Sequence, residues 1–208
     1  IQEQWNYTVG AVFKHFGKNT MQQLVLSRNV WSNNAKKYFN NTDNPSDLLL
    51  DYTSKEIENK LRFEITSTLK NNYKLNLGVG LENATYSNST FQQLAIPDGV
   101  QEIDFSSKLS MLKYNLFGQI SKKYLNSNLG VSLGFRLDGM DYNSEMKNPL
   151  NQFSPRASLS YKLSDKLSVN ATTGIYKQLP AYTILGYRNN LNELINKNNG
   201  LKFIEAIH

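Results

Sequence analysis

Cysteine is absent from this 208-residue sequence, and histidine occurs only twice. Without a thiol, the chain can form neither disulfides nor cysteine-ligated metal sites, and it has no cysteine nucleophile. His15 and His208 lie near opposite ends of the chain, so a shared metal site is an unfavourable interpretation. No local motif indicates a Ser-His-Asp arrangement. We therefore expect no enzyme activity, no metal site and no cofactor.

Long apolar runs and blocks of like charge are also missing. No stretch of about 18 apolar residues occurs, which excludes a membrane-spanning helix. The 23 Lys and Arg residues exceed the 17 Asp and Glu residues, for a net charge of +6, but they are scattered along the chain. This distribution does not indicate a nucleic-acid-binding tail. A basic balance fits contact with anionic lipid headgroups as well as simple solubility.

The sequence does contain a regular alternation of apolar and polar residues. In residues 129–137 every odd position is Leu, Val or Phe, and the even positions are Gly, Ser and Arg. Residues 61–66, 74–82, 157–163 and 167–175 repeat this period of two, which is the period of a β-strand. Within these windows the apolar row carries no charge. Residues 20–30 and 107–120 show no single register, and we expect a β-bulge or a one-residue slip there.

Two kinds of connection separate the predicted strands. Short polar turns lie at residues 15–19, 70–74, 125–128 and 164–166, and long polar segments lie at residues 33–57, 84–102, 139–154 and 177–200. The two kinds alternate along the chain, so every long segment lies at the same end of an antiparallel sheet. Outer-membrane barrels have this arrangement, with short periplasmic turns and long extracellular loops.

A soluble β-sandwich is the alternative, because it also alternates apolar and polar residues. It would be a ligand-binding module of the carbohydrate-binding type, with its aromatic loops as the site. The charge-free rows, the long segments at one end and the aromatic residues near the strand ends favour lipid outside and water inside. The two interpretations differ in the fate of the apolar row in residues 129–137, which a sandwich buries between two sheets.

A longer passage adds a family resemblance. Residues 133–190 contain GFRLDG, NPLNQFSPRASLSYKL and TGIYKQLPAYTILGY, and here the sequence resembles the TonB-dependent outer-membrane receptors of the Bacteroidota type. The resemblance implies an all-β, antiparallel up-and-down transmembrane β-barrel. We expect residues 1–208 to form part of the C-terminal barrel domain of a larger receptor, with about eight strands plus the start of a ninth. The plug domain of that receptor is expected to be absent from this sequence.

The same resemblance implies a function in active transport. Receptors of this family lie in the cell outer membrane and import a scarce ligand, such as an iron chelate, cobalamin or an oligosaccharide, with energy delivered by TonB. The implied partners are outer-membrane lipid, the receptor's own plug domain, the TonB system and an unknown imported ligand. Nucleic acid is not among them.

Charged residues of the polar rows are the candidates for the lumen, because a barrel directs them into its water-filled interior. There they solvate the channel, bind the plug or contact a ligand. Residues 176–190 add aromatic and amide side chains at the outer mouth, which can stack on a ligand; packing of this loop on its neighbours is the simpler interpretation. The candidates for ligand or lumen contacts are Arg62, Glu64, Arg136, Asp138, Arg156, Tyr176, Gln178, Tyr182, Tyr187 and Arg188.

Overall fold

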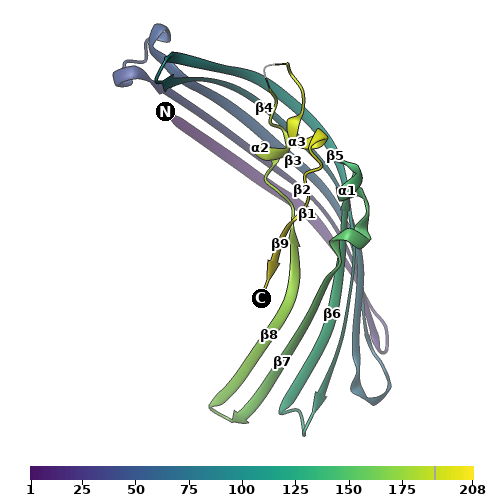
Figure 1. Cartoon of the computed structure of the whole chain (residues 1–208). Helices are drawn as coiled ribbons and strands as arrows, with labels where there is room; N and C mark the ends of the chain where they lie inside the picture. Colours follow the sequence, from purple (N-terminus) through teal and green to yellow (C-terminus); the bar gives the residue numbers. More distant parts are fainter. Residues whose placement is uncertain (190) are drawn as a thin grey trace.

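The computed structural model describes residues 1–189 and 191–208. Nine strands form one antiparallel sheet in which each strand pairs with the next along the chain (Figure 1). The strands are β1 (Gln2–Phe16), β2 (Thr20–Tyr38), β3 (Leu48–Thr68), β4 (Lys74–Ile96), β5 (Gly99–Tyr124), β6 (Leu129–Met140), β7 (Ser154–Ser164), β8 (Leu167–Gln178) and β9 (Ile204–Ile207). The expected all-β, up-and-down fold is thereby confirmed.

The helices of the described residues are short and lie in the connections. They are the α-helices α1 (Ser144–Lys147), α2 (Tyr182–Leu185) and α3 (Ile195–Asn198), and the 3-10 turns η1 (Phe39–Asn41), η2 (Pro45–Asp47), η3 (Lys70–Asn72) and η4 (Pro149–Gln152). No helix in residues 1–189 or 191–208 is long and apolar enough to cross a membrane.

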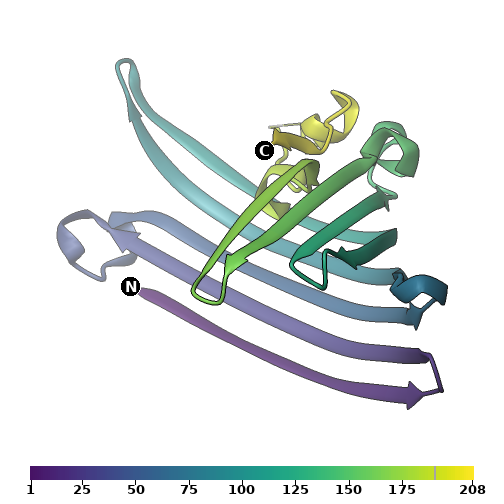
Figure 2. The same ribbon diagram turned by 90° about the horizontal axis from the view of Figure 1, so that it is seen from below.

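The sheet curves into an open trough. Figure 2 shows the strands side by side around one concave face, with the segment after β8 lying on that face. The pairing register determines which residues share a face. Leu61 of β3 lies beside Leu81 of β4, which lies beside Tyr114 of β5, and all three belong to the convex face. Glu82 and Lys113, their neighbours along the chain, pair on the concave face.

The convex face is apolar and open across the middle of the sheet. Leu133 of β6 and Val169 of β8 are 57% and 50% exposed, and Leu75 of β4 is partly exposed. The described residues form one sheet, with no second sheet to cover these side chains. A soluble sandwich would bury this face against another sheet. The sandwich alternative is therefore wrong, and the apolar row faces outward.

The sheet has no bulge within residues 20–30 or 107–120, where we expected one. In β5, Leu109 and Met111 face the concave side and are buried, whereas Leu112 and Leu116 face the convex side and are exposed. The apolar residues therefore change face within a regularly paired strand. The expectation for β5 failed because the connections after β6 and β8 cover its concave face near Met111. Apolar residues therefore move from one face of the strand to the other, and in the sequence this resembles a one-residue slip in register.

Two of the long connections are shorter than expected. Residues 84–102 are almost entirely strand, and residues 33–57 are strand apart from the turns η1 and η2 with their neighbours. The connections after β6 and β8 remain long. The alternation of apolar and polar residues in β4 ends before residue 83, although β4 stays paired with β5 beyond it. Asn83 and Thr85 lie on the convex face there, and both are polar. The sequence pattern therefore stops earlier than the strand does.

A small apolar core lies on the concave face near the long connections. Its buried members are Ala84, Tyr86, Leu109, Met111, Met140, Tyr142, Met146, Tyr182 and Leu185. They come from the inward rows of the sheet and from the connections after β6 and β8. Gly186 permits the close approach of these parts, because a Cβ at this position would lie 2.6 Å from the ring of Tyr86. This core holds residues 179–189 and 191–203, which we call the inner strap, against the sheet.

Candidate functional site

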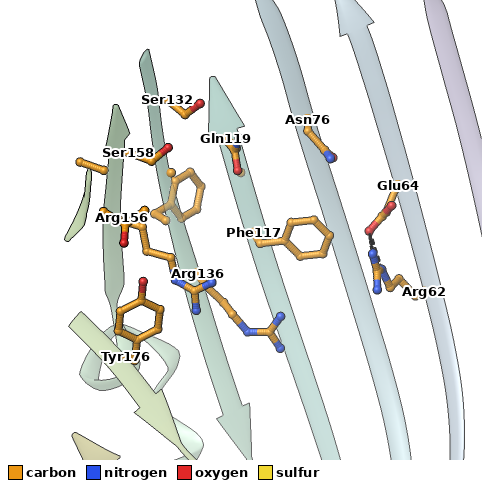
Figure 3. A pocket seen from close by; sticks show the side chains of 15 residues that line it. Arg62, Glu64, Asn76, Phe117, Gln119, Ser132, Arg136, Arg156, Ser158 and Tyr176 are labelled. Carbon is orange, nitrogen blue, oxygen red and sulfur yellow. Dashed lines mark hydrogen bonds and ion pairs between the residues drawn. The ribbon is translucent and has the colours of Figure 1, made fainter. Parts of the chain in front are cut away.

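The concave face carries a hollow of about 380 Å³ that extends from β3 to β8 (Figure 3). Residues at alternate positions line it, because strand pairing aligns the inward rows of neighbouring strands. The side chains that line it include Arg62, Glu64, Asn76, Phe117, Gln119, Ser132, Arg136, Arg156, Ser158, Thr172 and Tyr176. The hollow therefore combines cationic, hydroxyl, amide and aromatic groups, as a polar barrel interior does.

Two of the arginines are paired with carboxylates on their own strands. Arg62 donates from Nε to Oε1 of Glu64, and Figure 3 shows this pair on β3. Arg136 donates from Nε and Nη2 to the two carboxylate oxygens of Asp138, at 2.7 Å each. The partners occupy alternate positions of one strand, so both face the same side. The bidentate geometry fixes the direction of the Arg136 guanidinium.

Arg156 of β7 has no carboxylate partner among the residues that the structure describes. Its guanidinium carbon lies 4.6 Å from the ring centroid of Tyr176 on β8, a distance at which a ring face attracts a cation. Arg62, Arg136 and Arg156 all line the hollow, whereas Glu64 is the carboxylate that lines it. The hollow is therefore cationic, and Arg156 is the arginine with the most donors left for another molecule.

Phe117 of β5 provides an aromatic surface in the hollow. It pairs with Gly78 of β4, and a Cβ on that glycine would lie 2.2 Å from the Phe117 ring. The glycine therefore lets the ring lie flat across the neighbouring strand. The Arg62 guanidinium carbon lies 5.5 Å from the centroid of this ring. Phe117 and Tyr176 thus place ring faces beside cations in the same hollow.

A second hollow of about 310 Å³ adjoins the first through Arg136, which lines both. Asp138 and Gln178 line it, together with Lys113 and Glu82. Lys113 and Glu82 form an ion pair at 2.5 Å. The polar surface therefore continues from the first hollow toward the inner strap.

Tyr182 of α2 joins the inner strap to charged residues of the sheet. Its hydroxyl donates to Oε1 of Glu58 at 2.7 Å and accepts a hydrogen bond from Nζ of Lys113. Lys60 lies 2.6 Å from the other oxygen of Glu58. Burial, followed by the hydrogen bond to Glu58, raises the pKa of Tyr182 above its ordinary value. The hydroxyl therefore keeps its proton and remains the donor to Glu58.

Further contacts fasten the inner strap along the concave face. Ser107 donates from Oγ to the carbonyl of Gly186 at 2.6 Å and accepts from Nε of Arg188 at 2.8 Å. Tyr187 meets Phe105 edge to face, with ring centroids 5.8 Å apart. These contacts join β5 to residues 186–188, so the inner strap is fixed to the concave face of the sheet.

The structure distributes the predicted site residues among three places. Arg62, Glu64, Arg136, Arg156 and Tyr176 line the first hollow. Asp138 and Gln178 line the second hollow. The third place is the inner strap, where Tyr182, Tyr187 and Arg188 contact residues of the sheet. This corresponds to the simpler interpretation, in which the segment packs on its neighbours.

Sequence reasoning missed several residues of the concave face. Phe117 was not a candidate because its segment showed no clean register. Ser132 and Ser158 share the alternation phase of Arg136 and Arg156, so the period of two could have found them. Lys113 had no such signal, since its partners Glu82 and Tyr182 lie far away in the sequence.

Comparison with known proteins places this geometry in context. A family model described as "TonB dependent receptor-like, beta-barrel" matches residues 1–202. The pyoverdine outer membrane receptor FpvA from Pseudomonas aeruginosa PAO1, solved bound to pyoverdine, is similar over 98% of this chain and 32% of that chain, with a TM-score of 0.69 and 16% identity. The FpvAI–pyocin S2 complex is similar over 91% and 28%, with a TM-score of 0.60 and 17% identity.

At these identities the likeness to solved structures shows the fold alone. No curated protein sequence matches the chain. The chain spans about a third of the length of the receptor structures it resembles. The Bacteroidota type stays a prediction, because neither comparison specifies it. The family model nevertheless covers nearly all of the nine-stranded sheet, and the chain belongs to the TonB-dependent receptor-like β-barrel family.

Proposed function

We propose that residues 1–208 form part of the C-terminal barrel domain of an outer-membrane receptor that imports a scarce ligand with energy delivered by TonB. Family membership supports this function, and the cationic hollow on the concave face is the observation that carries it. In this proposal the exposed apolar rows of the convex face contact outer-membrane lipid. The plug domain and its contact with the TonB system belong to the remainder of the receptor.

Among iron chelates, cobalamin and oligosaccharides, we favour an iron chelate as the ligand. Arg156 has guanidinium donors free of carboxylate, and Tyr176 offers a ring face beside it. Phe117 adds a second ring face. An anionic chelate with aromatic or amide groups suits this combination, because the cations bind its charge and the rings stack on it. The fold relative FpvA was solved with pyoverdine bound, which agrees with this class.

The test is ligand binding and import by the full-length receptor. Arg156→Gln removes one positive charge from the hollow. It should weaken binding of a ferric chelate roughly tenfold to a hundredfold, because a hydrogen bond to a charged group contributes about 1.5–3 kcal/mol. Radioiron-labelled catecholate and hydroxamate chelates, added to outer-membrane vesicles, give the affinity. Cobalamin and malto-oligosaccharides serve as competitors from the other two classes.

Lys162→Gln is the matched control. It removes the same charge from the same inward row of β7, but Lys162 is paired with Asp165 at 2.6 Å near a short turn and lies outside the hollow. Equal losses of affinity in the two variants would contradict the proposed site. Import that continues after TonB is deleted would contradict the proposed energy source.

A further inference from the structure

On β1 to β5, the convex face has a band in which every charged residue is positive, between its apolar band and the long connections. The row that contains Leu26, Leu61 and Leu81 is the edge of the apolar band nearest the long connections. In the next three rows of β1 to β5, the charged residues are Arg28, Lys55 and Lys108. All three side chains are exposed. We call these three residues the basic collar.

On β1 to β5, carboxylates of the convex face begin beyond the basic collar. Glu3 lies in the next row, and Asp51 lies in the row after it. Asp51 there forms an ion pair with Lys36 at 3.0 Å. On this part of the convex face, cations without an ion-pair partner therefore lie nearest to the apolar band, and carboxylates lie farther from it.

No ion pair neutralises the basic collar within residues 1–189 and 191–208. Arg28 donates to the hydroxyl of Tyr7 at 3.3 Å and to Oδ1 of Asn59 at 2.9 Å. A guanidinium has five N–H donors, so Arg28 keeps donors for another molecule. Lys55 lies over the ring face of Trp5, with Nζ 5.9 Å from the centroid. Arg28 and Lys55 therefore lie against neutral groups and remain able to bind an anion.

Aromatic residues mark the same level of the convex face. Trp5 and Tyr7 are 49% and 44% exposed, and their rings stack with centroids 6.2 Å apart. Exposed Trp and Tyr side chains gather where the hydrocarbon of a bilayer meets its headgroups. The basic collar therefore lies at the depth where lipid phosphates are found.

A shallow groove of about 580 Å³ crosses the convex face from Val9 of β1 to Leu112 of β5. Leu26, Leu61 and Leu81 line one side of it, and Arg28, Asn59 and Asn83, which lie in the next row toward the long connections, line the other side. The groove is therefore mostly apolar, with polar side chains along the side that faces the basic collar. Such a surface matches an acyl chain below a charged headgroup.

We infer that the basic collar and this groove bind a phosphate-bearing glycolipid of the outer leaflet, with its headgroup at Arg28, Lys55 and Lys108 and an acyl chain in the groove. The inference rests on the proposed outer-membrane location, which places the long connections outside the cell. Lys55 and Lys108 lie two strands apart, about 10 Å, so the site suits a headgroup larger than one phosphate. A second copy of the chain fits poorly, because a two-fold contact would bring the two basic collars together.

The experiment compares lipid binding by the full-length receptor and by the triple variant Arg28→Gln, Lys55→Gln, Lys108→Gln. Lipid A with both of its phosphates and the same lipid after phosphatase treatment are the probes, titrated in detergent micelles. Each basic residue near an anionic lipid contributes about fivefold in affinity, so the triple variant should bind the phosphorylated lipid roughly a hundredfold more weakly. The affinity of the triple variant for the phosphorylated lipid should then equal the affinity of the wild type for the dephosphorylated lipid.

Lys122→Gln is the matched control, because Lys122 lies on the convex face near the short turns, beside Tyr73 and Tyr124. It should bind lipid A that carries both phosphates within about twofold of the wild type. Heat-modifiable migration establishes that each variant is folded, and the three single variants, each with about a fivefold loss, replace the triple variant if it does not fold.

Three outcomes would overturn the inference. They are equal affinity of the wild type for both lipids, unchanged binding by the variants, and a dimer that forms through this face. If the receptor still lies in the outer membrane and imports its chelate, these results leave the proposed function intact. Absence of the receptor from the outer membrane would overturn both.

Discussion

Replacing Tyr182 with Phe tests how the inner strap is fastened to the sheet. The Tyr182 hydroxyl bonds with Glu58 and Lys113, and its ring stacks on Tyr86 with centroids 5.8 Å apart. The substitution removes both hydrogen bonds and keeps the ring. It therefore weakens the polar fastening without opening a cavity in the apolar core.

The expected cost is about 2 kcal/mol of strap docking, near the lower end of the range of about 1.5–3 kcal/mol for a hydrogen bond to a charged group. The cost stays low because neither charge is left unpaired. Glu58 keeps Lys60 at 2.6 Å, and Lys113 keeps Glu82 at 2.5 Å. A loss of about 2 kcal/mol raises the fraction of open strap roughly 30-fold.

Native-state hydrogen exchange of the full-length receptor in detergent measures this fraction. The informative amide is that of Gly186, which donates to the carbonyl of Tyr182 at 2.8 Å. Its exchange should accelerate roughly 30-fold, whereas amides in the middle of β4 should not change. Tyr187→Phe is the control, because that ring contacts Phe105 and its hydroxyl makes no hydrogen bond within the described ranges. Equal acceleration in both variants, or acceleration throughout β4 and β5, would refute the reasoning.

Other predictions concern the lipid face, the hollow and the response to pH. Leu133→Lys should destabilise the barrel in liposomes by about 2–4 kcal/mol in a denaturant titration, and Ser132→Lys on the concave face should cost much less. Gly78→Val should displace the Phe117 ring, since a Cβ there would lie 2.2 Å from it, and should weaken chelate binding. Because docking raises the pKa of Tyr182 above its ordinary 10.0, strap docking should hold up to about pH 10 and weaken as the pH rises further. Exchange in the Tyr182→Phe variant should lack this dependence.

The repeated features of the fold could be predicted from the sequence. The period of two in residues 129–137 places Leu133 and Arg136 on opposite faces, and the structure has them there. The same phase leads to Ser132, which lines the hollow. One face of each strand meets a uniform environment over several residues, so a local pattern suffices to assign it.

Contacts between distant segments left no such pattern. Tyr182 and Glu58 are 124 positions apart, and the sequence around each gives no indication of the other. We expected Tyr182 at the outer mouth, and its position relative to a mouth stays a prediction. What the sequence did not indicate is that buried Tyr86 and Met111 offer it an apolar surface on the concave face. The same surface places apolar residues on both faces of β5, and periodicity alone cannot distinguish that arrangement from a slipped register.

The mean hydropathy of −0.51 agrees with a membrane strand once each face is considered separately. β4 has 23 residues, yet only its convex positions from Leu75 to Leu81 belong to the apolar band. From Asn83 onward the convex positions are polar up to Ser89. In the proposed outer-membrane location, this part of the strand extends beyond the lipid. Its concave face meets water or the inner strap along the whole length. In that location a few apolar side chains in each strand suffice for contact with the bilayer, and average composition measures mainly the polar remainder. The period of the apolar residues, which averaging removes, is the signal that identifies such a strand.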